Sequence, residues 1–228
     1  MLEMKKYLNR RLTARQTVAI VALIAALAGL GYLSYTLVSA KILEAKVKAS
    51  LPKVCAGIRD QRRVLVNAIE AYKTQFGFYP PDHVVSRQPL VVDAITNTLL
   101  YELAGVTYDP TNKEFQVGHL ERADAKYVKE FFQCDGFKNC AENSNEVKHF
   151  LPDENPPVRQ LHDDPDVFAL SFPLYSEAVD PQVMWEFQVS SWRYISSNPT
   201  NNAGKFDLWI ELKTKNQTVT IGNWKTVE

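Results

Sequence analysis

The sequence predicts an α+β protein in which a long N-terminal helix packs on a C-terminal antiparallel β-sheet. Three observations predict this fold class. Residues 17–40 carry no charged side chain, residues 41–76 place apolar side chains at helical spacing, and the last third alternates apolar with polar residues. The chain has 228 residues, which is enough for one membrane anchor and one domain with its own core.

The first element is an apolar run preceded by a basic tail, residues 1–16. A helix over residues 17–40 is about 36 Å long, and the hydrocarbon core of a bilayer is about 30 Å thick. Basic residues are slightly more frequent before the run than after it, which favours an N-terminus inside the cell. We therefore expect a single-pass protein of the inner (cytoplasmic) membrane, with residues 41–228 forming an extracytoplasmic domain, periplasmic or extracellular.

The second element is an amphipathic helix over residues 41–76. Its apolar side chains lie three, four or seven residues apart and form one face for a core. They are Val54, Ile58, Leu65, Ile69, Tyr72 and Phe76. Pro52 is expected to kink or break the helix near residues 49–51, because proline lacks the N–H that the helix needs. Gly77 and the Pro80-Pro81 pair predict the end of the helix.

The middle of the chain predicts short elements. Residues 89–104 are expected to form a helix that stops at Gly105, and residues 123–132 a second one. A short strand is expected at residues 114–117. Residues 134–166, rich in Asp, Asn, Glu and Pro, predict a loop with one helical turn near residues 145–150.

The last third predicts strands. Residues 167–172 and 183–189 are strand candidates, and the alternation slips at Ser190-Ser191, where a bulge is expected. Residues 206–212 alternate strictly, and a partner strand with Val219 and Ile221 completes a hairpin.

Three stretches carry a family resemblance: the apolar anchor that continues into an amphipathic helix, the Ala68–Lys73 helix end followed by Phe76-Gly77-Phe78-Tyr79-Pro80-Pro81, and the closing Phe206–Trp209 and Ile221–Trp224 segments. This order resembles type IV pilins and, more closely, the major pseudopilin of type II secretion systems. The resemblance implies a pilin-like fold. It also implies a membrane-anchored structural subunit or accessory that assembles with other pilin-like subunits or secretion-system proteins.

The same resemblance implies a calcium ion near the C-terminal strands in some members. Asp163, Asp164 and Asp166 offer the oxygen ligands that calcium prefers, although their spacing matches no defined calcium loop. No other metal or cofactor is predicted.

A second function is kept as an alternative. The glycine and glutamate that mark the processing site of the family are absent around residues 15–18. The alternative is a membrane-tethered extracytoplasmic binding or sensing module with a pilin-like fold that does not polymerise.

Cys134 and Cys140 flank a short loop-like stretch and predict a disulfide in an oxidising compartment. Two free thiols are the alternative, and a metal site is disfavoured because the spacing is not that of zinc ligands. Cys55 falls on the amphipathic helix, where a single thiol behaves as a small apolar residue.

The sequence predicts no enzyme, because phosphate-binding, dinucleotide-binding, zinc-protease and nucleophile-elbow motifs are all absent. Lys+Arg and Asp+Glu both total 26, so the net charge of zero argues against nucleic acid. His83 and His162 lie beside aspartates in loop-like stretches typical of solvated surface.

Trp209 and Trp224 are interaction candidates, since aromatic anchors are favoured at interfaces, and packing is the competing interpretation.

Overall fold

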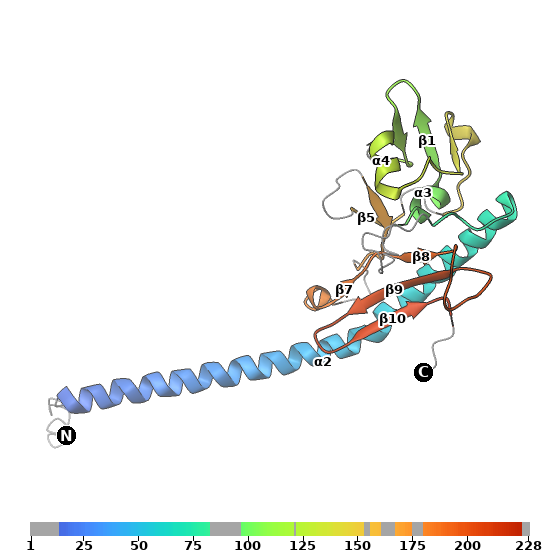
Figure 1. Cartoon of the computed structure of the whole chain (residues 1–228). Coiled ribbons are helices and arrows are strands. Elements are labelled where there is room, and N and C mark those ends of the chain that lie inside the picture. The colour runs from blue at the N-terminus through green and yellow to red at the C-terminus, as the bar shows by residue number, and fades with distance from the viewer. Residues whose placement is uncertain are drawn as a thin grey trace, which may run out of the picture. The chain divides into compact units, whose positions relative to one another are not determined.

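The computed structural model describes residues 14–82, 97–120, 122–152, 156–160, 167–174 and 180–224 (Figure 1). The chain divides into two compact units, Met1–Ala49 and Ser50–Glu228. One helix, α2 (Ala14–Phe76), contributes residues to both units.

In the first unit, the large apolar side chains of α2 are exposed, among them Val18, Leu27 and Leu37. This part of the helix is long and apolar enough to cross a membrane. The predicted break at Pro52 is wrong, because α2 continues through this residue. One proline removes a single backbone hydrogen bond, and the turns on either side of it can still form theirs.

In the second unit, the predicted apolar face of α2 is confirmed. Val54, Ile58, Leu65, Ile69 and Tyr72 are all buried, and Phe76 is half-buried. The helix ends at Phe76, where Gly77 adopts a φ of +84° and donates its N–H to the carbonyl of Lys73 at 2.7 Å. The left-handed backbone explains the glycine at this stop.

The C-terminal sheet is antiparallel. Its strands are β7 (Gln188–Val189), β8 (Arg193–Ile195), β9 (Asp207–Lys213) and β10 (Thr218–Gly222). The order is β10-β9-β7, and β8 also pairs with β9 (Figure 1). The predicted hairpin is β9–β10, in which Ile221 pairs with Ile210.

The predicted bulge is confirmed by the register. Val189 pairs with Leu212 and Arg193 with Trp209, so residues 190–192 stand opposite only residues 210–211. The expected strand over residues 183–189 is mostly wrong, because Met184–Glu186 form a 3-10 helix, η2, and only Gln188 and Val189 belong to a strand, β7.

The middle of the chain forms a second sheet with the order β3-β2-β1-β4. Its strands are β1 (Val106–Asp109), β2 (Glu114–Gln116), β3 (Ala123–Asp124) and β4 (Cys140–Ala141). The same part of the chain contains the helices α3 (Leu99–Ala104) and α4 (Ala125–Phe132) and the 3-10 helix η1 (Ser144–Glu146). The predicted strand at residues 114–117 and the stop at Gly105 are confirmed. The helix predicted over residues 123–132 begins at Ala125. Of the helix predicted over residues 89–104, residues 89–96 lie outside the described residues, and α3 covers Leu99–Ala104.

The remaining pair is β5 (Val158–Gln160) with β6 (Phe168–Leu170), a two-stranded antiparallel sheet. β5 falls within the stretch that was predicted to be loop. Beyond β6, the carbonyl of Leu170 accepts the N–H of Trp192 at 2.8 Å. The described chain is therefore α+β with antiparallel sheets towards its C-terminus, as predicted.

Candidate functional site

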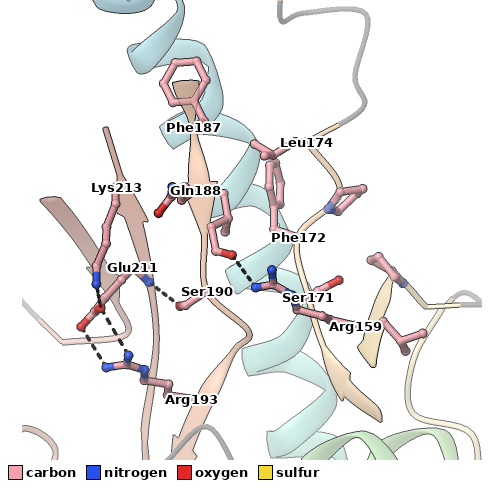
Figure 2. Close-up of a pocket in the computed structure, with 14 residues that line it drawn as sticks. Arg159, Ser171, Phe172, Leu174, Phe187, Gln188, Ser190, Arg193, Glu211 and Lys213 are labelled. Carbon is pink, nitrogen blue, oxygen red and sulfur yellow. Dashed lines mark hydrogen bonds and ion pairs between the residues drawn. The ribbon is translucent and has the colours of Figure 1, made fainter. Parts of the chain in front are cut away.

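An open pocket of about 690 Å³ lies beside β7 in the second unit (Figure 2). Three separate stretches of chain form it: residues 157–159 at β5, residues 171–174 after β6, and residues 187–190 at β7. Arg193, Glu211 and Lys213 complete the lining from β8 and β9. Its volume lies within the range of ligand-binding sites.

Part of the lining is apolar. Phe172, Pro173 and Leu174 follow β6, and Phe187 precedes β7. The ring of Phe172 packs against α2 at Gly57, where an added Cβ would come within 3.1 Å of it. The glycine thus lets the aromatic ring approach the helix closely.

The other part of the lining is charged. Arg193 forms a two-pronged ion pair with Glu211, at 2.9 and 3.3 Å, and Lys213 lies 3.8 Å from the same carboxylate. Arg159 donates to the carbonyl of Val189 at 3.2 Å (Figure 2). The two-pronged pairing with a carboxylate fixes the orientation of the Arg193 guanidinium. Arg159 and Lys213, by contrast, are exposed.

The pocket carries an excess of positive charge. Three cations, Arg159, Arg193 and Lys213, face one carboxylate, that of Glu211, which leaves two positive charges among the lining residues. Pairing with two cations occupies the Glu211 carboxylate. Among the described lining residues, Arg159 has no acidic partner, and Lys213 shares the one carboxylate with Arg193. An anionic group of a ligand would therefore be attracted to Arg159 and Lys213.

The predicted interaction residues Trp209 and Trp224 are not among the residues that line this pocket. Both are half-buried, and their rings meet edge-on with centroids 5.8 Å apart. The Trp224 ring also lies so close to Gly222 that a Cβ there would come within 2.6 Å. Packing over the end of β10 thus accounts for both rings, and a partner contact stays a prediction.

The predicted disulfide between Cys134 and Cys140 is not formed in this structure, where both residues and Cys55 are free thiols. Burial raises the pKa of all three, which keeps them protonated and poorly nucleophilic near neutral pH.

Most of the remaining metal-ligand candidates fall in parts of the chain that the structure does not describe. His83, His162, Asp163, Asp164 and Asp166 lie outside the described residues. His149 is described, and its Nδ1 lies 2.7 Å from the carbonyl oxygen of Ala104. Within the described ranges, no group of three or more His, Cys, Asp or Glu side chains could hold a metal ion.

The sequence did not reveal the pocket residues as a set, because Arg159, Phe172 and Lys213 come from three distant stretches. Comparison with protein families, with characterised proteins and with solved structures gave no match.

Proposed function

We propose that the chain is a membrane-anchored, pseudopilin-like structural subunit or accessory of a type II secretion or type IV pilus-like assembly. The observation that supports this best is that the two parts of α2 differ in which apolar side chains are exposed. Its first part exposes apolar side chains such as Leu23 and Leu33, and its second part buries one stripe against the second unit's own core. The anchor spans the inner membrane with its N-terminus inside.

An exposed apolar helix needs an apolar environment. Lipid supplies one, and a like helix of a neighbouring subunit supplies another. Ile42, just beyond the uncharged run, is also exposed. A helix that lay only in lipid would have no reason to keep an apolar surface past the bilayer edge, where water begins.

A photo-crosslinking amino acid at position 42 tests this proposal in the membrane of the cells that produce the chain. We expect crosslinks to a second copy or to another membrane-anchored chain. The matched control is the same amino acid at Lys215, an exposed position on the β9–β10 turn. Crosslinks from position 42 to lipid alone would contradict an assembling subunit.

The pocket beside β7 favours the second candidate, a membrane-tethered binding or sensing module that does not polymerise. If the chain is such a module, crosslinks to a partner should form at the pocket and not along the helix. Placing the same photo-crosslinking amino acid at Leu174, a half-buried residue of the pocket lining, and comparing it with position 42 therefore distinguishes the two functions.

A further inference from the structure

The side of β7 that faces the pocket is an open strand edge. In the described residues β7 is the last strand of its sheet and pairs only with β9. Ser190 donates its N–H to the carbonyl of Glu211, whereas the carbonyl of Val189 accepts from the Arg159 side chain. A charged side chain therefore occupies the position where a further strand would bond.

Arg159 can leave that position at low cost. It is exposed, and its hydrogen bond to Val189 is a single one at 3.2 Å. An approaching backbone N–H could replace it on the carbonyl, and the guanidinium would then be free to pair with an acid. Among the described residues, a strand edge whose free carbonyl is capped only by one exposed arginine is thus open to strand addition.

The two kinds of lining residue fix which side chains would fit. Arg159 and Lys213 supply positive charge, because Arg159 has no acid among the described lining residues and Lys213 only shares the Glu211 carboxylate with Arg193. Phe172, Leu174 and Phe187 supply an apolar surface. Successive residues of a strand point to opposite faces, so two side chains on the pocket face lie two positions apart.

We propose that this pocket binds an extended peptide segment of a partner protein. The segment adds to the open edge of β7 and points alternate acidic and aliphatic side chains into the pocket. The acid pairs with Arg159 and Lys213, and the aliphatic side chain packs against Phe172 and Leu174. The inference does not depend on the proposed function, because it concerns the second unit alone.

The test uses the full chain in a neutral detergent and the fluorescein-labelled peptide Ser-Glu-Thr-Leu-Thr-Glu-Ser, whose glutamates and leucine share one strand face. Fluorescence anisotropy should show saturable binding that weakens as salt is added. Replacing both glutamates by glutamine, or the leucine by serine, should weaken binding severalfold. Equal binding of the glutamine peptide would mean apolar adsorption only and would overturn the inference.

Variants of the chain make the test specific. R159E together with K213E should weaken binding at least about tenfold, because two attractive pairs become repulsive. K215E makes the same kind of charge change on an exposed residue outside the pocket lining and should change affinity less than about twofold. Both substituted positions are exposed, so the double variant should keep its fold, and circular dichroism should show the spectrum of the unaltered chain.

Absence of saturable binding, or binding that R159E/K213E leaves unchanged, would overturn the inference. Neither outcome bears on the membrane anchor or on crosslinking from position 42. A result that refutes peptide binding at the pocket is therefore distinguishable from one that refutes the proposed function.

Discussion

The buried pair Tyr72–Glu102 is the most informative place to perturb the second unit. Both side chains are 0% exposed, and the Tyr72 hydroxyl donates to a carboxylate oxygen of Glu102 at 2.8 Å. The carboxylate also accepts the backbone N–H groups of Lys138 and Asn139, at 3.0 and 3.1 Å. One acid thus joins α2 to α3 and to the chain before β4.

The magnitude follows from these contacts. Tyr72→Phe removes one hydrogen bond to a buried charged group, which costs about 1.5–3 kcal/mol. The ring keeps its packing against Phe76 and Phe150, with centroids 4.5 and 5.2 Å away. For a chain of this size, in which 1 kcal/mol corresponds to about 2–4 °C, the melting temperature should fall by roughly 3–12 °C. Burial and the neighbouring Glu102 raise the pKa of Tyr72, so the hydroxyl remains a donor at any accessible pH.

Glu102→Gln should cost at least as much. An amide has one acceptor oxygen, and its NH2 group would face a backbone N–H that the carboxylate now accepts. The double variant Tyr72→Phe/Glu102→Gln should lose less than the sum of the two single losses, because the partners share one network.

The assay is denaturant unfolding of the full chain in neutral detergent, followed by tryptophan fluorescence. Tyr127→Phe, which removes the same atom from a half-buried ring, is the control and should cost little. A loss below about 0.5 kcal/mol for Tyr72→Phe, or strict additivity in the double variant, would refute this reasoning.

Three further predictions concern single positions. Trp192→Ala should cost about 3–5 kcal/mol in unfolding free energy, because this side chain is 1% exposed, whereas Trp185→Ala at 79% exposure should cost little; equal costs would contradict the burial of Trp192. Gly105→Ala should lower the melting temperature more than Gly204→Ala, since both have positive φ (+79° and +77°) but only at Gly105 does the new Cβ meet a neighbouring atom at 2.0 Å; the reverse order would contradict that packing. Hydrogen bonds from the following turn hold the pKa of Asp109 below 3.8. Its contribution should therefore be present above about pH 4 and be lost as the pH falls through the lowered pKa. The melting-temperature difference between the wild type and Asp109→Asn should shrink on acidification, and a growing difference would contradict the assignment.

Regular periodicity made the long elements predictable. The stripe from Val54 to Tyr72 and the alternation in residues 206–212 both extend over several repeats, and both are buried as predicted. The slip at Ser190 also predicted the bulge, because an extra residue reverses which face the side chains take.

Short-range alternation was a weaker guide. Val183 and Phe187 are buried as a strand would place them, but Trp185 between them is exposed on a 3-10 turn. The two buried residues stand on either side of the turn, and a spacing of two over so short a stretch does not distinguish this from a strand. Local patterns therefore misplaced the element while identifying its buried ends.

The features that depend on distant contacts could not be predicted. Glu102 lies within an apolar helix stripe, and nothing near it in the sequence shows that Tyr72 and the 138–139 backbone satisfy its carboxylate. The pocket could not be predicted either, because Arg159 comes from the β5–β6 pair and Lys213 from the C-terminal sheet, and no local pattern shows that both line one pocket.

The central claim, an anchor within α2, is tested most directly by alkaline carbonate extraction of membranes from cells that produce the chain. We expect the full chain to stay in the membrane pellet. The variant Leu23→Lys/Leu27→Lys should move to the supernatant, since each charge at the centre of a span costs about 2.5–3.5 kcal/mol. Release of the unaltered chain by carbonate would contradict the claim.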